Sequence, residues 1–427
     1  MPDTPPRVTV PPGSSAAQVQ DLLGRVLAGD AELLLGTSGS TGSPALSVLR
    51  GQDLRASAAA THQRLGGPGR WVLALPPSHI AGVQVLVRAS VAGVAPLVTT
   101  GADGGGFDPA LVARDLQPDA PENSAARQTD AQENSAARQT DAQENGAAWK
   151  TPAPGDGGPV GRTYLSLVPT QVVRLVDDLT ATRRVAASVD AILVGGAALS
   201  PAVAQRAREL GLPLVRTYGS TETCGGCVYD GRPLPGVEVN LTDAGRISLT
   251  APWVTRGWLL PDGTVTRERT ATGARIEEAD PASDGTRRRT LVTDDLGELA
   301  DGVLTVLGRA DDLITTGGVK VAPTLVADAV TALSAVGECA VVGVPDPVWG
   351  ERVTLVATRP SAGARGAAVP AAAPPSLAAL RDALRGQLEP AALPRAVRWV
   401  EAMPVIGPGK YDRAALRELA DRPDEVT

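Results

Sequence analysis

The sequence predicts an α/β protein (mixed α/β and α+β) with a large N-terminal domain of layered α/β sheets and a small, mobile α+β C-terminal domain. Its 427 residues, of which 43% are hydrophobic and 20% charged, suffice for a large core and for more than one domain. Short apolar runs alternate with longer helical patterns, as strands alternate with helices in α/β proteins. A separate pattern begins near residue 311, so we expect domains at 1–307 and 308–427.

The large domain is predicted to begin with a helix over 18–29 and a buried strand over 31–35, which runs into the loop "GTSGSTGSP" at 36–44. The run "RWVLALP" at 70–76 predicts another strand, and a helix follows that starts near His79. Further on, "RTYLSLVPTQVVRLV" predicts a strand and a helix, "VDAILVGGAAL" a strand and a turn, and "LPLVRTYGSTE" a strand and a loop.

Two polar segments interrupt this pattern. The first, at 118–160, contains "ENSAARQTDAQ" twice in tandem, at 122–132 and 133–143, with almost nothing apolar to bury. An eleven-residue period would suit a helix, but a solenoid unit would need a hydrophobic face. We therefore predict a duplicated, disordered insertion at 118–160, and a flexible loop over the charged residues 265–290.

The remaining elements divide between the two domains. Residues 236–307 hold short β-like runs such as "RISLT" and "GVLTVLG". Beyond the junction "GRADDLITTGG", we predict a helix over 321–333, strands over 338–346 and 352–359, and a helix over 376–388. This order of elements is the α+β pattern of the small domain.

Composition excludes several classes of partner. A net charge of −7 and an aromatic content of 3% argue against nucleic-acid binding. The apolar stretch around 80–99 is interrupted by Gln84 and Arg88 and is too short and polar to span a membrane, and we see no secretory signal. Three cysteines are too few for a disulfide framework, so we expect a cytoplasmic location without stable membrane association.

Cys224 and Cys227 form a C-x-x-C pair. With two histidines in the chain and no second cysteine pair, the pattern does not support a zinc site. A thioredoxin-like motif would need its own βαβ unit, which the surrounding residues lack. We interpret both cysteines as structural.

Five stretches point to nucleotide chemistry when they are taken in order. The loop at 36–44 offers amides and hydroxyls to an anion, although alone it could be an ordinary loop and it is not a Walker A motif. The turn "YGSTE" at 218–222 sets a carboxylate where Mg²⁺ could lie beside phosphates. The others are "TDDLGEL" at 293–299, with acids that could accept ribose hydroxyls, "GRADDLITTGGVKV" at 308–321, and "PVIGPGKYDRAAL" at 404–416, with one lysine.

Over residues 36–416 this ordered set resembles the adenylate-forming superfamily of acyl- and aryl-CoA ligases. The resemblance implies ATP, CoA and Mg²⁺ as cofactors and a small-molecule acid as the further partner. It implies that the acid attacks ATP to give an acyl-adenylate and pyrophosphate, and that the CoA thiol then displaces AMP. A homodimer is the oligomeric state that the resemblance favours.

The resemblance also assigns nucleotide contacts. The β- and γ-phosphates would be embraced by Thr37, Ser38, Gly39, Ser40, Thr41 and Gly42. Further nucleotide or acyl-pocket contacts would come from Gly195, Gly196, Ala197, Tyr218 and Gly219. Asp295 and Arg309 would hold the ribose.

The chemical steps are assigned to four residues by the same resemblance. Thr221 would contact the adenylate phosphate, and Glu222 would ligate Mg²⁺. Asp311 would be the hinge of the small domain, and Lys410 would drive adenylation, although it could also be a plain surface lysine. The loop departs from the family at Ala45, where a lysine generally follows the proline.

A narrower resemblance is carried by "LPPSHIAGVQVLVRAS" at 75–90 and "LVPTQVVRLV" at 167–176, which look like the o-succinylbenzoate–CoA ligases of menaquinone synthesis in their compact actinobacterial form. It implies o-succinylbenzoate as the acid and places His79 at the acyl pocket, near the path of the pantetheine thiol. His79 could instead be a packing residue at a helix start. Three other readings remain: a ligase for a different acid, an enzyme that loads a carrier protein, and a degenerate nucleotide-binding homologue.

Overall fold

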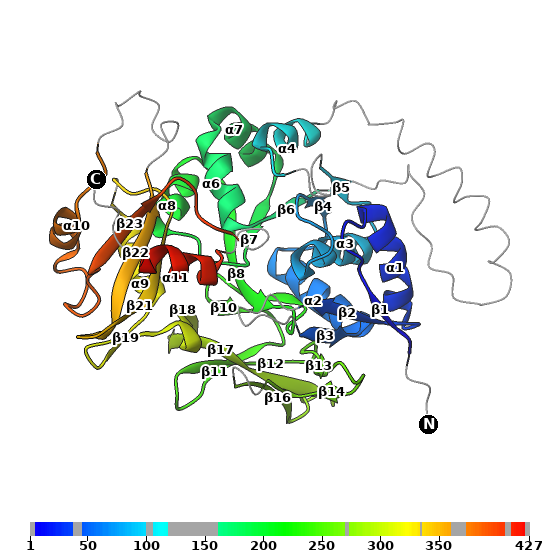
Figure 1. Ribbon diagram of the computed structural model, residues 1–427. Helices are drawn as coiled ribbons and strands as arrows, with labels where there is room; N and C mark the ends of the chain where they lie inside the picture. Colours follow the sequence, from blue (N-terminus) through cyan, green and yellow to red (C-terminus); the bar gives the residue numbers. More distant parts are fainter. Residues whose placement is uncertain are drawn as a thin grey trace, which may run out of the picture.

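The computed structural model describes residues 5–36, 45–99, 106–117, 161–269, 273–333, 335–359, 373–405 and 411–422. A seven-stranded sheet lies at the centre of the larger part of the molecule (Figure 1). Its strands are, in sheet order, β10 (Arg232–Pro233), β9 (Gly225–Tyr229), β8 (Leu214–Ser220), β7 (Ala191–Val194), β6 (Thr163–Leu167), β4 (Arg70–Leu73) and β5 (Leu97–Val98). The five strands from β8 to β5 are parallel to one another. Strand β9 runs antiparallel to β8, and β10 runs antiparallel to β9.

Helices cover both faces of this sheet. Successive side chains of a strand point to opposite faces, and here the side chains on both faces are apolar and need to be buried. Trp71 and Leu73 of β4 pack in one core with α1 (Ala16–Ala28), α2 (Gly51–Arg64) and α3 (Ile80–Ala92). The intervening Val72 packs in a second core with the helices of the other face. Those helices are α4 (Pro109–Asp115), α6 (Pro169–Asp177), α7 (Leu179–Ser188) and α8 (Pro201–Glu209).

The ends of α1 follow from its local sequence. Ser15 and Gln18 form a capping box at the N-terminus, and Gly29 ends the helix in the left-handed conformation, with φ at 93°. The predicted helices and strands of the large domain are found within a few residues of their expected bounds, and the predicted α/β fold class is confirmed.

Two further sheets pack beside the central one. The first has the order β1 (Arg7–Thr9), β2 (Glu32–Gly36), β3 (Leu46–Leu49), β13 (Trp258–Leu259) and β14 (Val265–Thr266). The second has the order β11 (Glu238–Leu241), β12 (Arg246–Ala251), β17 (Arg288–Ala300), β16 (Ala274–Ala279) and β15 (Glu268–Arg269), and β18 (Val303–Arg309) pairs with β17.

The prediction of a flexible loop over 265–290 is wrong, because most of the described residues in this segment form strands. Strand β16 pairs with β17 from Arg275 to Ala279, and β14 and β15 lie just before it. The physical reason is an alternation that the many charges obscure, because Ala274 and Ile276 are buried while Arg275 and Glu277 face solvent. The segment is therefore a half-exposed part of the sheet.

The C-terminal part has its own sheet and core. The sheet contains β20 (Val319–Val321), β19 (Ile314–Thr316), β22 (Gly350–Thr358) and β21 (Cys339–Asp346), with β23 (Ala396–Val400) on β22. One face packs against α9 (Pro323–Thr331) and α10 (Leu377–Leu384), and the other against α11 (Arg413–Asp421). The short 3₁₀ helix η1 (Ala310–Asp312) connects it to β18.

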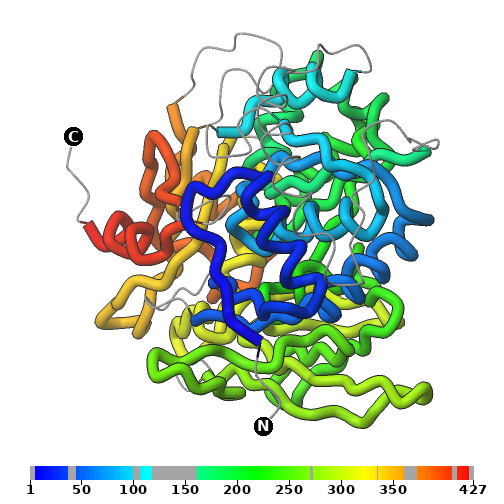
Figure 2. The backbone as a smooth tube through the Cα atoms, turned by 90° about the vertical axis from the view of Figure 1, so that its right-hand side faces the viewer, coloured from blue at the N-terminus to red at the C-terminus, as the bar shows by residue number. Residues whose placement is uncertain are grey.

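The second view shows how the ends of the chain lie. In Figure 2 the blue helix α1 crosses the centre of the molecule, and the red helix α11 lies at its left-hand edge. None of the helices in the described ranges combines the length and the apolar character that a membrane span needs. The duplicated segment predicted as an insertion at 118–160 lies outside the described residues.

Candidate functional site

The turn between β8 and β9 carries the first group of predicted site residues. Gly219 lies so close to the Gly225 carbonyl that a Cβ atom would overlap it. The Thr223 hydroxyl closes the turn, accepting from the Ser220 N–H at 2.8 Å. Thr221 and Glu222 are thereby buried.

The Glu222 carboxylate is oriented by a tryptophan from another sheet. The indole N–H of Trp258, on β13, donates to Glu222 Oε1 at 2.9 Å. The backbone is held as well, because the Thr255 N–H donates to the Glu222 carbonyl at 2.8 Å. A carboxylate can accept several such bonds, so Glu222 keeps acceptor capacity for a cation.

The predicted phosphate loop reaches this turn at its described end. Residues 37–44, which include all six loop residues from Thr37 to Gly42, lie outside the described residues. Gly36, the last residue of β2, accepts a hydrogen bond from Thr221 Oγ1 at 3.4 Å. At the other end, Ala45 packs against the main core. The loop therefore begins beside Thr221 and Glu222.

The predicted ribose residues form a second group. Tyr218 donates its hydroxyl to Asp295 Oδ2 at 2.7 Å, and Asp295 lies opposite Arg309 in the register of β17 and β18. Burial raises the pKa of Asp295, and the Tyr218 hydrogen bond and the Arg309 charge oppose this. Burial and the Asp295 charge raise the pKa of Tyr218, which keeps its proton and remains a donor.

Arg309 also bridges to the predicted hinge. Its guanidinium binds both carboxylate oxygens of Asp311, at 2.8 and 2.9 Å. Burial alone would raise the pKa of Asp311, but the hydrogen bond and charge of Arg309 lower it. The structure therefore brings Tyr218, Asp295, Arg309 and Asp311 into one chain of contacts.

Two more predicted sites lie at the same end of the central sheet. Gly195, Gly196 and Ala197 directly follow β7, and Thr217 of β8 donates to the Val194 carbonyl at 3.2 Å. His79 is exposed and precedes α3, which follows β4. Because β4, β7 and β8 are parallel, their carboxyl ends meet at one edge, where open α/β sheets bind ligands.

Lys410 lies outside the described residues, as do 406–409. The flanking residues Val405 and Tyr411 form an isolated antiparallel β-bridge. Asp412 then caps α11 by accepting from the Ala415 N–H at 3.0 Å. The position of the lysine relative to the turn stays a prediction.

Arg88 was missed as a functional residue. It is on α3, only 4% exposed, and no described acidic residue forms an ion pair with it. Its NH2 group donates to the Tyr229 hydroxyl at 3.4 Å, and its Cζ lies 4.8 Å from the Trp71 ring centroid. Its Nε has no hydrogen-bond partner among the described residues. Burial lowers its pKa, but a guanidinium stays charged in proteins.

Gln84 lies one turn before Arg88 on α3. Its amide donates to the Cys224 carbonyl at 2.6 Å, which ties α3 to the Glu222 turn, and its buried Oε1 has no partner in the described part of the chain. The signal for both residues was present in the sequence, where they interrupt an apolar stretch. There it served to exclude a membrane span, and the stretch 75–90 carried the narrower resemblance without a role for either residue.

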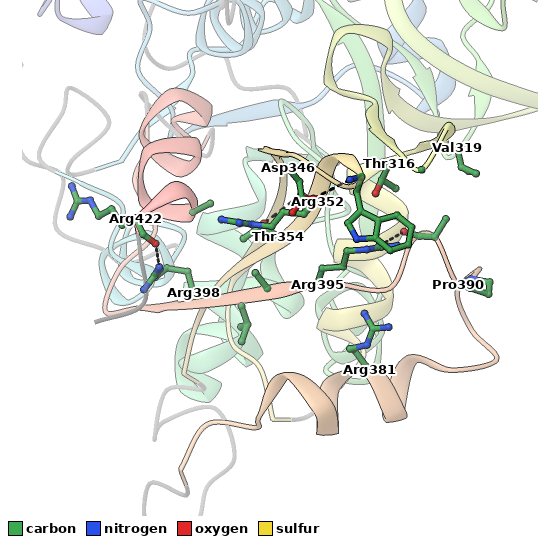
Figure 3. A pocket seen from close by; sticks show the side chains of 16 residues that line it. Thr316, Val319, Asp346, Arg352, Thr354, Arg381, Pro390, Arg395, Arg398 and Arg422 are labelled. Carbon is green, nitrogen blue, oxygen red and sulfur yellow. Dashed lines mark hydrogen bonds between the residues drawn. The ribbon is translucent and has the colours of Figure 1, made fainter. Parts of the chain in front are cut away.

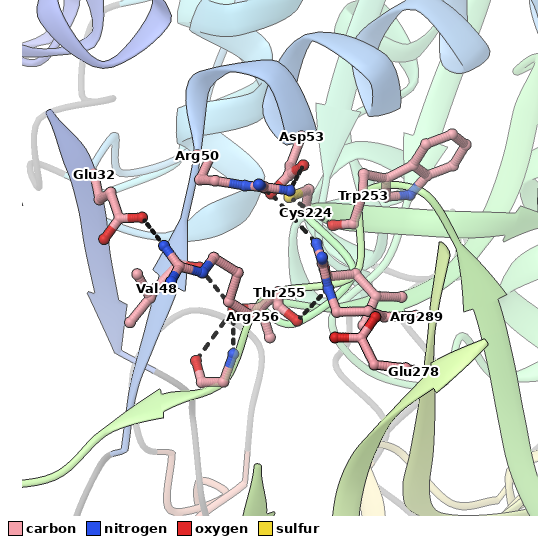
Figure 4. A network of polar contacts seen from close by, with 12 residues as sticks. Glu32, Val48, Arg50, Asp53, Cys224, Trp253, Thr255, Arg256, Glu278 and Arg289 are labelled. Carbon is pink, nitrogen blue, oxygen red and sulfur yellow. Dashed lines mark hydrogen bonds and ion pairs between the residues drawn. The ribbon is translucent and has the colours of Figure 1, made fainter. Parts of the chain in front are cut away.

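A buried ionic network lies next to the Glu222 turn (Figure 4). Asp53 receives both hydrogen bonds of the Arg50 fork at 2.9 Å and lies 3.8 Å from Arg289. Arg289 in turn donates to the carbonyls of Val254 and Thr255. Because Thr255 holds the Glu222 backbone, the network stabilises the Glu222 turn.

Arg50 cannot take the place of the missing lysine at position 45. The register of β2 and β3 places Leu46 opposite Gly36 and Leu49 opposite Leu33. Arg50 therefore lies at the far end of the hairpin from the loop, about 13 Å away along the strand. Its charge is paired with Asp53.

The C-x-x-C cysteines are both buried free thiols. Burial raises the pKa of Cys227 to about 12, and burial followed by the Asp53 charge raises that of Cys224. The Cys224 carbonyl accepts from Ser57 at 3.1 Å, and its thiol donates to the Trp253 carbonyl at 3.3 Å. These contacts fit the structural interpretation.

A cavity of about 900 Å³ opens on the C-terminal sheet (Figure 3). Five arginines line it: Arg352, Arg381, Arg395, Arg398 and Arg422. Arg395 lies 3.9 Å from the ring centroid of Trp349, and among the described lining residues only Asp346 is acidic. The buried Arg352 Nε has no hydrogen-bond partner in the described residues. The cavity is therefore suited to an anionic ligand.

Two family models match the chain. The model of the AMP-binding enzymes matches residues 160–260, and the model of the AMP-binding enzyme C-terminal domain matches 325–410. A protein of Mycobacterium tuberculosis named "probable 2-succinylbenzoate–CoA ligase" is 36% identical over 417 residues, which cover 96% of this chain and 91% of that one. The 2-succinylbenzoate–CoA ligase of Lactococcus lactis is 31% identical over 207 residues, covering 44% of this chain and 39% of the relative.

Solved structures show the same fold. The o-succinylbenzoate CoA synthetase of Bacillus subtilis in complex with its acyl-adenylate intermediate has a TM-score of 0.63 at 23% identity, covering 90% of this chain and 68% of that one. ATP-bound MatB from Rhodopseudomonas palustris has a TM-score of 0.65 at 23% identity, covering 90% and 67%.

Proposed function

The chain belongs to the AMP-binding, adenylate-forming enzymes, and we propose that it ligates o-succinylbenzoate to CoA with ATP, giving o-succinylbenzoyl-CoA, AMP and pyrophosphate. The product is an intermediate of menaquinone synthesis. The chain is an AMP-forming acid–thiol ligase, as the match to the mycobacterial relative over 96% of its length indicates. The substrate and the residue roles below are the proposal.

The observation that carries the choice of substrate is the buried Arg88. o-Succinylbenzoate has two carboxylates, of which one is activated and the other remains charged. An unpaired guanidinium in a low-dielectric site costs free energy that a second carboxylate would offset. His79 precedes α3 and Arg88 lies about 13 Å further along it, so the acid would extend along this helix from His79 toward the arginine. A fatty or simple aromatic acid has no group for Arg88.

Thr221, Glu222 and the loop from Thr37 to Gly42 would surround the phosphates of ATP. Glu222 fits a Mg²⁺ ion, because Mg²⁺ takes one or two protein carboxylates and completes its shell with phosphates and water. When bound, Mg²⁺ would neutralise charge that develops on the phosphates. Trp258 would hold the carboxylate in place for this contact.

Asp295 would accept the ribose hydroxyls, with Tyr218 orienting it and Arg309 beside it. Gly195, Gly196, Ala197 and Gly219 would border the adenine, near the carboxyl ends of β7 and β8. Lys410 would bring its positive charge to the α-phosphate during adenylation. His79 would lie at the entrance of the acyl pocket.

We propose CoA as the thiol because of the arginine-lined cavity. The nucleotide part of CoA carries a 3′-phosphate and a diphosphate, and both match the guanidinium groups that line the cavity. A carrier protein would present a single phosphate on its pantetheine arm. The cavity therefore favours CoA over a carrier protein.

The two half-reactions would use two positions of the small domain. We propose that 308–427 moves as a unit about Asp311, so that the Lys410 loop leaves the site when the thiol enters. The pair of Arg309 and Asp311 spans this junction.

A homodimer is the oligomeric state that we expect.

The proposal is tested by incubating the protein with ATP, Mg²⁺, CoA and one acid from a panel of o-succinylbenzoate, benzoate and octanoate. Thioesters are identified by mass spectrometry and pyrophosphate is measured. We expect o-succinylbenzoyl-CoA, dependent on both ATP and CoA. Turnover only with another acid would overturn the substrate, and adenylate formation without a CoA thioester would overturn the choice of thiol.

A further inference from the structure

We propose that Tyr229 is a positioning residue that aims Arg88 at the second carboxylate of the acid, and thereby sets the selectivity for dicarboxylic over monocarboxylic substrates. This inference rests on the proposed function, in which Arg88 meets that carboxylate. It concerns a residue that none of the sequence motifs contains. Tyr229 is fully buried at the end of β9, the strand that follows the Glu222 turn.

The hydrogen-bond directions follow from counting donors. The Thr61 hydroxyl donates its single proton to the Ser57 carbonyl at 3.0 Å. It can therefore only accept from the Tyr229 hydroxyl, which lies 3.0 Å away. With its proton turned toward Thr61, the Tyr229 oxygen presents its lone pairs to Arg88 NH2 at 3.4 Å. A neutral acceptor thus orients the guanidinium and leaves its charge uncompensated.

The other side of Arg88 is also neutral. Its guanidinium lies over the Trp71 ring, and the Trp71 indole N–H donates to His62 Nε2 at 3.0 Å. As an acceptor at Nε2, His62 must be uncharged. Burial, reinforced by the Arg88 charge, lowers the pKa of His62 to about 4, which keeps it so. Arg88 is therefore held by a phenol and an indole, and by no anion in the described residues.

This arrangement has a direct consequence for selectivity. A carboxylate that reaches Arg88 supplies the counter-charge that the fold withholds, whereas a monoacid leaves the guanidinium unpaired. Sites that are built to pair with a polar substrate group reject analogues without it far more strongly than apolar pockets reject a missing methylene. Alignment matters because an arginine and a carboxylate bind best as a planar, two-bond pair.

The experiment compares Tyr229→Phe with Tyr164→Phe as a matched control. Tyr164 packs on Trp71 with ring centroids 5.0 Å apart, and its hydroxyl donates to the carbonyls of Leu65 and Gly67. Each variant removes one hydroxyl from the same cluster, but only Tyr229 contacts Arg88. The readouts are KM and kcat for o-succinylbenzoate, for benzoate and for ATP, with thermal unfolding as a check on folding.

We expect Tyr229→Phe to raise KM for o-succinylbenzoate about tenfold or more, the loss for one hydrogen bond to a charged group. KM for ATP and any turnover of benzoate should stay unchanged, and Tyr164→Phe should leave the preference for the dicarboxylic acid intact. If Tyr229→Phe does not fold, Thr61→Val gives the same test, because it removes the group that holds the tyrosine proton.

Arg88→Met separates this inference from the proposed function. If Arg88→Met abolishes the preference for o-succinylbenzoate while Tyr229→Phe and Tyr164→Phe behave alike, the positioning role is overturned and the proposed function stands. If Arg88→Met leaves the preference intact, the carboxylate is recognised elsewhere, so the inference and the role of Arg88 both fail while the ligase function stands. A uniform loss toward every acid in Tyr229→Phe would indicate a merely structural hydroxyl and would also overturn the inference.

Discussion

Single residues decide where positive charge meets the phosphates. Position 45 holds an alanine, and Arg50 lies at the wrong end of its hairpin and is paired with Asp53. The chain has three lysines, at 150, 320 and 410, and of these only Lys410 stands in the motif that carries an adenylation lysine. We therefore propose that Lys410 supplies the decisive charge of the first half-reaction.

Replacing Lys410 tests this directly. We expect Lys410→Ala to slow ATP–pyrophosphate exchange at least about a hundredfold, on the scale of a lost transition-state contact. Thioester formation from preformed acyl-adenylate should be affected far less, because the lysine is needed only while pyrophosphate leaves. Lys320→Ala is a suitable control, since that lysine is exposed on β20. Near-normal exchange in Lys410→Ala would refute the assignment.

His62 makes stability depend on pH in a definite direction. Its pKa is about 4 in the folded chain and about 6.5 when unfolded, so the unfolded state binds the proton more tightly. The contribution is complete above about pH 6.5 and is lost as the pH falls toward 4, to a total of about 3 kcal/mol.

The variant His62→Gln isolates this contribution, because glutamine can still accept from Trp71 but does not titrate. Urea unfolding of both proteins from pH 7 to pH 4.5 should show the wild type losing more stability than the variant. Parallel pH profiles would mean that His62 does not carry the dependence.

At the level of the elements, the buried network joins α2, β17 and the segment before β13 under the Glu222 turn (Figure 4). Asp53→Ala would leave Arg289 and the half-buried Arg50 without their carboxylate. Breaking a buried pair in this way costs about 3–5 kcal/mol, and we expect a loss of that size in urea unfolding. Glu278→Ala, which breaks the exposed pair with Arg267, should cost less than about 1 kcal/mol. Equal effects would show that the network carries no special share of the stability.

The duplicated segment gives the second prediction at this scale. Its units have no apolar face, and the segment enters between α4 and β6, away from the five motifs in the sequence. Deleting residues 122–143 should therefore leave kcat and KM for all three substrates within about twofold, since surface insertions are tolerated in loops. A large rise in any KM would mean that the segment contributes to a substrate site.

How far the sequence could predict the structure differs from element to element. Helices with clear caps, such as α1, and buried apolar strands, such as β7, were predictable because local signals and burial agree. Strand β16 was not, because three exposed charges along it hide the alternation of its two buried side chains.

The same limit applies to the site. Motif residues such as Tyr218 and Asp295 are far apart in the chain and could be placed together only through the family resemblance, and the structure joins them by a hydrogen bond. Arg88 lies in the stretch 75–90 that carries the narrower resemblance, but no role was assigned to it there. Its proposed role depends on burial without a counter-ion, which is a property of the packed structure and cannot be read from the sequence.

For the whole molecule, the question is how one chain runs two reactions. The larger part brings together the Glu222 turn, the predicted ribose-binding residues and the carboxyl ends of β4, β7 and β8. The arginine-lined cavity belongs to the C-terminal sheet. The proposed nucleotide site on one part and the arginine-lined cavity on the other fit the proposed alternation between adenylation and thiol transfer. The acid must then be activated before CoA is needed.

The measurement that tests this account most directly is acid-dependent exchange of labelled pyrophosphate into ATP, in the presence of Mg²⁺ and without CoA. We predict rapid exchange with o-succinylbenzoate and little exchange with benzoate or octanoate. In Arg88→Met this preference for o-succinylbenzoate should be lost. Nucleotide binding without exchange for any acid would contradict adenylation itself and would identify the chain as a binding protein that has lost the chemistry.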